Sequence, residues 1–143
     1  MNAFSFGSAQ GEHLSVSEIA YERTRSGDFH DDNWLTCMVQ IRAGAFDGRY
    51  FASVLTDEIH ELHDHLARMH REVKGELSFT TLERQLEFTL SCDRLGHLQL
   101  VGIATDQPGE GQSLHFSLSL DQTDLARAVS ELHGVLGAFP VRR

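Results

Sequence analysis

The chain has 143 residues, a formal net charge of −9 and a pI of about 5.3. Hydrophobic residues make up 41% of it and charged residues 23%, which is the balance of a globular protein rather than a disordered one. The acidic excess argues against nucleic-acid binding, because that binding depends on neutralising phosphates with Lys and Arg. It favours a cationic protein as partner, since opposite charges speed encounter, although solubility alone would also explain it.

The length suits one domain, which we expect over residues 12–143, after a loose N-terminal arm at residues 1–11. Phe4 and Phe6 of this arm could instead pack onto a neighbouring part of the protein. The arm lacks the basic and apolar regions of a signal peptide, and no stretch approaches the roughly 20 apolar residues of a membrane span. Cys37 and Cys92 form no CxxC pair and lie in alternating apolar patterns. We therefore expect free thiols and a cytoplasmic protein with no membrane contact.

Alternating apolar and polar residues predict most of the chain to be β-structure. Residues 12–23 change parity midway, which indicates a strand with a bulge, and residues 24–32 form a turn-rich loop. The clearest alternation covers residues 33–43, and residues 45–55 follow after Gly44, which predicts an antiparallel hairpin. Further strands are predicted later in the chain, over residues 77–81, 86–92, 97–105 and 114–120.

Two amphipathic helices are predicted. Thr56 is expected to cap the first, over residues 56–74, whose apolar residues recur at steps of three and four: Ile59, Leu62, Leu66, Met69 and Val73. Asp121 caps the second, which ends before Pro140. The order βββ-α-ββββ-α predicts an α+β fold, with a mostly antiparallel sheet of about six or seven strands and two helices packed on one face. No internal repeat is visible.

The first helix carries four of the nine histidines, at positions 60, 63, 65 and 70. An HExxH zinc motif needs a second His four residues after the first, and Asp64 stands there instead. The histidines also point in different directions around the helix, whereas a closed zinc site needs about four ligands. We therefore expect no metal; the alternative site would use His60, His63 and Asp64.

The chain has no GxSxG nucleophile elbow, no phosphate-binding GxxxxGK loop and no recognisable set of nucleophile, base and orienting residue. We therefore expect no catalytic residue, no cofactor and no enzymatic activity. Carboxylates cluster before the clearest strand and along the first helix, and we take them as a candidate surface for a cationic partner. Trp34 joins them because exposed Trp anchors interfaces, although it would also serve as a cap over the sheet end. The candidate partner-binding residues are Asp31, Asp32, Trp34, Glu58, Glu61 and Asp64.

Several short motifs occur in an order and spacing that resembles a family of small bacterial proteins, mostly of unknown function, that includes the WapI-type immunity proteins. The motifs are Asp32-Asn33-Trp34-Leu35, Thr56-Asp57-Glu58-Ile59 with Leu62 and Leu66, Leu82-Glu83 with Leu86, Asp121-Gln122-Thr123 with Leu125, and Phe139-Pro140. They extend from about residue 12 to the end of the chain.

The resemblance implies a small α+β domain without catalysis that binds and blocks a contact-dependent or polymorphic toxin, in some cases a nuclease. The histidine-rich helix is not a feature of that family. Two other functions stay open from the residues themselves: a general interaction or structural module, perhaps a homodimer, and a metal-binding protein that uses the histidine-rich helix.

Overall fold

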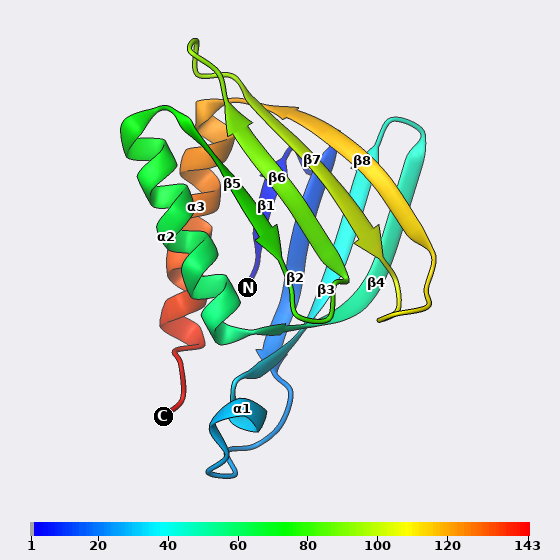
Figure 1. The fold of residues 1–143 in the computed structure, drawn as a ribbon, viewed down its shortest axis with the longest axis vertical. Helices are drawn as coiled ribbons and strands as arrows, with labels where there is room; N and C mark the ends of the chain where they lie inside the picture. Colours follow the sequence, from blue (N-terminus) through cyan, green and yellow to red (C-terminus); the bar gives the residue numbers. More distant parts are fainter. Residues whose placement is uncertain (1) are drawn as a thin grey trace.

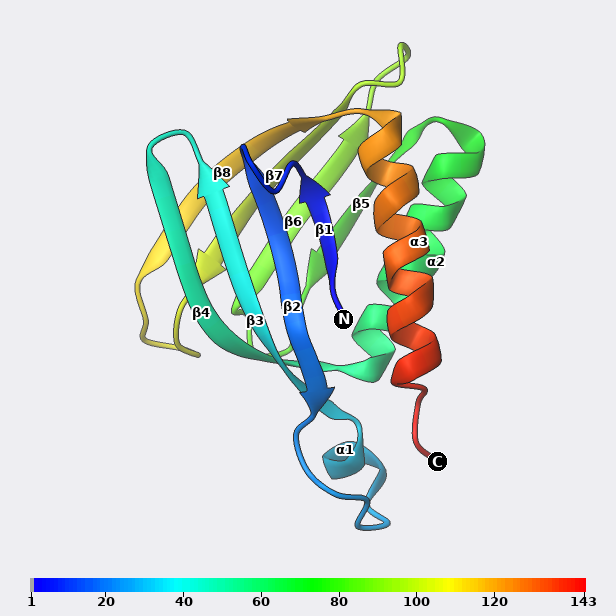
Figure 2. The ribbon, with the colours of Figure 1, turned by 180° about the vertical axis from the view of Figure 1, so that it is seen from behind.

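The computed structural model describes residues 2–143 and contains two four-stranded antiparallel sheets that face each other, with two long helices along one side (Figures 1 and 2). The first half of the chain comprises β1 (Phe4–Gly7), β2 (His13–Tyr21), α1 (Phe29–Asp32), β3 (Trp34–Ala43), β4 (Phe46–Leu55) and α2 (Thr56–Glu72). The second half comprises β5 (Gly75–Thr80), β6 (Leu86–Cys92), β7 (Leu98–Thr105), β8 (Ser113–Leu120) and α3 (Gln122–Ala138).

The α+β class, the antiparallel pairing and the two main helices are confirmed. The strands number eight rather than six or seven, and they form two sheets, β1-β2-β3-β4 and β5-β6-β7-β8, rather than one. Apart from the short α1, four strands followed by a long helix occur twice, a repetition that is not visible in the sequence. Strand β4 leads directly into α2, and the four strands that follow this helix form the second sheet.

The N-terminal segment is not the loose arm expected from its Gly and Ser content. Phe4 and Phe6 point the same way from β1, and both are buried. Strand β1 pairs with β2, where Phe6 lies opposite Leu14, and the Ser5 amide donates to Glu131 of α3 at 2.9 Å. Burial of these two aromatic rings helps to hold the segment on the core. Met1 of the expected arm lies outside the described residues.

The hairpin of β3 and β4 and the bulge in β2 are both confirmed. Ala43 pairs with Phe46 around a two-residue turn in which Gly44 has a φ of 59°, a conformation that favours glycine. In β2 the pairing shifts between Ser17 and Ala20, where the predicted change of parity occurs.

Helix α2 buries most of its predicted stripe, but its two ends differ from the prediction. Ile59, Leu62, Leu66 and Met69 are buried, whereas Val73 ends the helix in the left-handed conformation with 46% of its surface exposed. Thr56 lies inside the helix and Leu55 takes the N-cap position. The Glu58 carboxylate reaches back to the Leu55 amide at 2.7 Å and so satisfies a backbone donor at the helix start.

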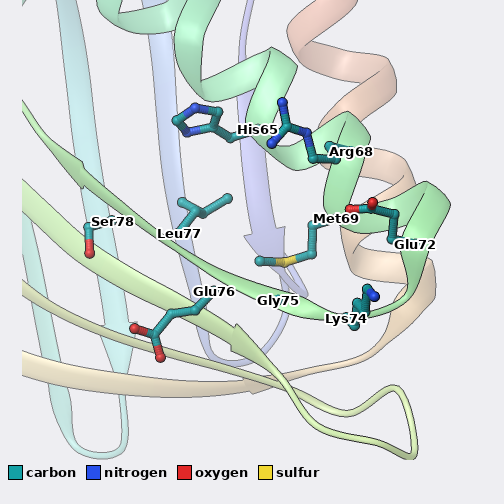
Figure 3. Close-up of a pocket in the computed structure, with 9 residues that line it drawn as sticks. All are labelled: His65, Arg68, Met69, Glu72, Lys74, Gly75, Glu76, Leu77 and Ser78. Carbon is teal, nitrogen blue, oxygen red and sulfur yellow. The ribbon is translucent and has the colours of Figure 1, made fainter.

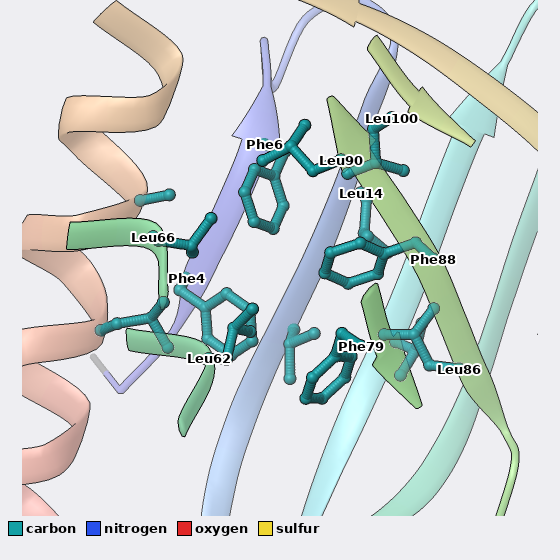
Figure 4. Close-up of a cluster of buried hydrophobic side chains, with 14 of the residues drawn as sticks. Phe4, Phe6, Leu14, Leu62, Leu66, Phe79, Leu86, Phe88, Leu90 and Leu100 are labelled. Atoms are coloured by element: carbon teal, nitrogen blue, oxygen red, sulfur yellow. The ribbon is translucent and has the colours of Figure 1, made fainter. Parts of the chain in front are cut away.

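One continuous apolar core joins both sheets and both helices. In Figure 4, Leu62 and Leu66 of α2 lie against Phe4 and Phe6 of β1, and Phe88 of β6 faces them. The rings of Phe6 and Phe88 meet edge to face with centroids 5.7 Å apart, so the two sheets are in direct contact through aromatic side chains.

Gln85, in the turn between β5 and β6, connects the two sheets where β4 has no neighbouring strand. Its side chain is buried, donates to the Phe51 carbonyl at 3.1 Å and accepts from the Ser53 amide at 3.3 Å. Its own carbonyl accepts from the Tyr50 hydroxyl and the Thr105 amide. The side-chain amide thus replaces the peptide group that a neighbouring strand would offer to β4.

Within the described residues, no helix is long and apolar enough to cross a membrane.

Replacing Phe6 by Ala should lower the free energy of unfolding by about 3–5 kcal/mol, because it leaves a cavity between the two sheets. The matched control is Phe51→Ala, since Phe51 is 66% exposed and its loss should change stability by less than about 0.5 kcal/mol. Urea denaturation of the purified variants measures both. Equal stability of wild type and Phe6→Ala would show that β1 does not contribute to the core.

Candidate functional site

The six predicted partner-binding residues lie near the start of α2 and the end of the α1 loop, but the structure gives them different roles. Asp32 is buried and accepts from the Ser26 amide at 2.7 Å, the Ser26 hydroxyl at 2.8 Å and the Gly27 amide at 2.8 Å. The Ser26 backbone hydrogen bond lowers the pKa of Asp32 against the opposing effect of burial. Asp32 therefore holds the loop and is not available to a partner.

Asp31 and Trp34 flank this buried carboxylate. Asp31 is exposed and lies 3.3 Å from the Arg23 guanidinium. Trp34 is half-buried at the start of β3, opposite Leu55. Asp31 thus offers a charge at the surface, whereas Trp34 offers part of its ring.

Asn33, between Asp32 and Trp34, is a buried hydrogen-bonding centre. Its side-chain oxygen accepts from the Thr56 hydroxyl at 3.0 Å and the Arg142 amide at 2.8 Å. Its side-chain nitrogen donates to the carbonyls of Phe29 at 2.7 Å and Arg142 at 2.9 Å. All of its side-chain polar capacity is used, and it joins α1, the start of α2 and the C-terminal segment.

Glu58 is a second connecting residue. One carboxylate oxygen accepts from the Leu55 amide and the other from the Leu82 amide at 2.6 Å, which ties α2 to the turn between β5 and β6. Burial raises the pKa of Glu58, and the charges of Glu61 and Glu83 add to that rise, while the two amide donors oppose it. Glu58 is therefore occupied within the fold.

Glu61 and Asp64 are the predicted carboxylates that α2 leaves exposed. Asp64 lies between two histidines, 3.5 Å from His60 and 3.1 Å from His63. The three residues of the alternative metal site thus lie together, but no group of three or more His, Cys, Asp or Glu residues in the part of the chain described here has a geometry that could hold a metal ion. His63 also lies beside His133 of α3, with ring centroids 6.0 Å apart.

A groove of about 380 Å³ lies between the C-terminal half of α2 and β5 (Figure 3). Met69 and Leu77 lie on its walls, together with His65 and with charged side chains of both signs: Arg68, Glu72, Lys74 and Glu76. Helix α2 therefore has two surfaces: an acidic N-terminal half and a groove of mixed charge.

Sequence reasoning missed Asn33 and Gln85 as organising residues. Asn33 lies inside one of the resemblance motifs, which was a signal that the position matters. Gln85 lies in a polar turn, and no local pattern indicates that its side chain is buried against β4.

A sequence model of the WapI-like immunity proteins matches residues 5–140. The chain belongs to the WapI-like immunity protein family. This membership confirms the resemblance and extends over nearly all of the fold described above. No curated protein sequence matches the chain.

Among solved structures, the WapI-like chain is similar to one described as Trypanosoma bruciei MRP1/MRP2. The TM-score is 0.51 at 12% sequence identity, and the match covers 95% of this chain and 84% of that chain. At this identity the likeness concerns the fold alone.

The motifs that carry the family resemblance are mainly contacts of the scaffold. Asn33 binds Thr56, Glu58 binds the Leu82 amide, and Pro140 accepts from the Tyr21 hydroxyl. The side chain of Asp121 caps α3 by accepting from the Asp124 amide. The motifs of this WapI-like protein therefore account for its fold and do not by themselves locate a partner-binding face.

Glu58 should make stability depend on pH. Because its pKa is raised above the ordinary 4.5, the folded state keeps this proton to higher pH than the unfolded state does. The free energy of unfolding should therefore fall as pH rises from 4.5 through the raised pKa. Asp32 affects stability in a separate pH interval, below 3.8, because its pKa is lowered. The ionised Asp32 carboxylate stabilises the folded state, and this contribution is lost as pH falls and the carboxylate is protonated.

The measurement is urea denaturation of wild type and Glu58→Gln across this pH interval, with Glu72→Gln as a control for losing one exposed charge from α2. The stability of wild type relative to Glu58→Gln should decrease as pH rises, because only wild type must ionise the buried group. A relative stability that increases over the same interval would contradict the prediction.

Proposed function

We propose that this chain is a non-catalytic immunity protein of the bacterial cytoplasm that binds a cationic protein toxin and blocks it. The match to the WapI-like family over residues 5–140 carries this proposal. The net charge of −9 supports a cationic partner, because a toxin that acts on nucleic acid must attract phosphate and an acidic inhibitor complements such a surface.

Within the proposed function, Glu61 and Asp64 on the exposed face of α2 make the main contact. Their exposure supports this role, since Asp32 and Glu58 already bind backbone amides of their own chain. Asp31 and Trp34 add to the same surface, because Asn33 holds the α1 segment against the start of α2. Carboxylates at the rim of an interface act mainly on the rate of association.

The first experiment uses the toxin gene adjacent to the gene for this chain. Co-expression of the chain should restore growth of cells that produce the toxin. Failure to protect against any toxin encoded next to it would contradict the immunity function.

The second experiment tests the binding face with the Glu61→Lys, Asp64→Lys double variant and the purified toxin. At low salt, association should slow by about tenfold or more and depend less on salt than for wild type, because electrostatic steering is lost. The matched control reverses two other exposed carboxylates, Glu18→Lys and Glu110→Lys, with the same change in net charge. Equal affinities of the two double variants at low salt would reject this face and leave the immunity function standing.

A further inference from the structure

Strand β4 is an edge strand on the side of the molecule away from the helices (Figures 1 and 2). The other edge of its sheet, β1, packs against α3, and the edge strand β5 of the second sheet packs against α2. An uncovered edge offers backbone donors and acceptors to another strand, which natural proteins normally cover, charge or pair.

The contacts of Gln85 show which backbone groups of β4 face outward. It binds the Phe51 carbonyl and the Ser53 amide, so these residues direct their N–H and C=O groups away from β3. Alternate residues of an antiparallel strand share this direction, so the groups of Asp47 and Arg49 also point outward. No hydrogen bond to either of these backbone positions is formed by residues 2–143 from outside the β3–β4 ladder.

The N-terminal half of β4 has the sequence Phe46-Asp47-Gly48-Arg49-Tyr50. If two copies of this segment are placed side by side and antiparallel, the side chains of one copy are complementary to those of the other. With Gly48 on a two-fold axis, Asp47 of one copy lies opposite Arg49 of the other, and the same pair occurs twice. Phe46 likewise lies opposite Tyr50 of the second copy. Opposite charges and aromatic pairs are the cross-strand partners that stabilise antiparallel strands.

The neighbouring side chains extend this charge pattern. Arg42 on β3 lies opposite Asp47 and forms an ion pair with it at 3.4 Å. Across the pair of copies the order becomes Arg42, Asp47, then Arg49 of the second copy, so positive and negative charges alternate over three strands. Arg49 itself lies within ion-pair distance of no carboxylate in residues 2–143, which leaves it free for this contact.

A hollow beside this edge has room for the aromatic ring. It has a volume of about 280 Å³ and lies between β4 and the β7–β8 hairpin, with Ile41, Tyr50, Ala104 and Leu114 among its lining residues. An apolar cavity of about 150 Å³ already holds benzene. Phe46, which is 66% exposed in the single chain, would enter the hollow of the other copy beside Tyr50.

We propose that β4 is a self-association surface, on which a second copy of this chain pairs its own β4 antiparallel about Gly48. The pairing covers residues 46–50 of each copy and forms four backbone hydrogen bonds between Asp47 and Arg49. Gln85 sets its limit, since it already occupies the edge at Phe51 and Ser53. The surface lies across the molecule from α2, so the inference does not rest on the proposed toxin binding (Figure 1).

Sedimentation equilibrium of the full chain over a concentration series tests the proposal with two charge reversals. Asp47→Arg places Arg opposite Arg49 of the second copy, and Arg49→Asp places two aspartates opposite each other. Each variant alone should raise the dimer dissociation constant by about tenfold or more, because like charges then meet twice. An equimolar mixture of the two variants should form a heterodimer, since both charge pairs between the two β4 strands are again complementary.

Thermal unfolding of each variant checks that the fold is kept, and formation of the heterodimer checks it independently. A wild-type chain that stays monomeric at about 1 mM would overturn the proposal and leave the edge open to an extended segment of another protein. A wild-type dimer that neither reversal weakens would also overturn it, as would variants that remain monomeric when mixed.

Discussion

Two buried side-chain amides supply hydrogen bonds that the backbone of this fold cannot supply for itself. Asn33 joins the α1 loop, the start of α2 and the C-terminal segment, and Gln85 joins the outer edge of β4 to the second sheet. Leaving such buried donors and acceptors unpaired costs about 1–3 kcal/mol each, so the two sheets and the helices depend on these contacts for their arrangement. The apolar core fills the space between layers that these amides hold in place.

The need of backbone amides for hydrogen-bond acceptors divides the acidic residues of the candidate site into two groups. Asp32 and Glu58 accept backbone amide hydrogens and hold loops and helix ends, although their charge alone suggested a partner-binding role. Within residues 2–143, the carboxylates of Glu61 and Asp64 accept no hydrogen bond from a backbone amide, and both remain at the surface of α2. The motifs of the family therefore consist mainly of residues that stabilise the fold. A partner would contact exposed side chains that form no such internal hydrogen bonds. The proposed toxin contact and the proposed β4 pairing lie on different sides of the molecule.

Periodicity predicted the strands, the two helices and the β3–β4 hairpin because those depend on neighbouring residues. It could not assign the strands to two sheets, since alternation does not show which strands pair, and the two sheets are joined by long-range contacts such as Gln85 with Phe51. The sequence could not show whether Phe4 and Phe6 pack, because their burial depends on α2 and β6, which lie far along the chain. Glu58 looked like a surface charge because its second donor, the Leu82 amide, is 24 residues away. The sequence proposed six partner-binding candidates but could not show that two of them, Asp32 and Glu58, already bind amides of their own chain. Glu61 and Asp64 are exposed, and their contact with a partner stays a prediction.

Backbone hydrogen exchange of the complex tests the proposed contact between the toxin and the exposed N-terminal half of α2. The chain is compared free and bound to the toxin encoded beside it. Amides over residues 57–64 and the α1 segment should exchange more slowly in the complex, while those of β7 and β8 should not change. Protection confined to other surfaces, with α2 exchanging at its free rate, would contradict the account.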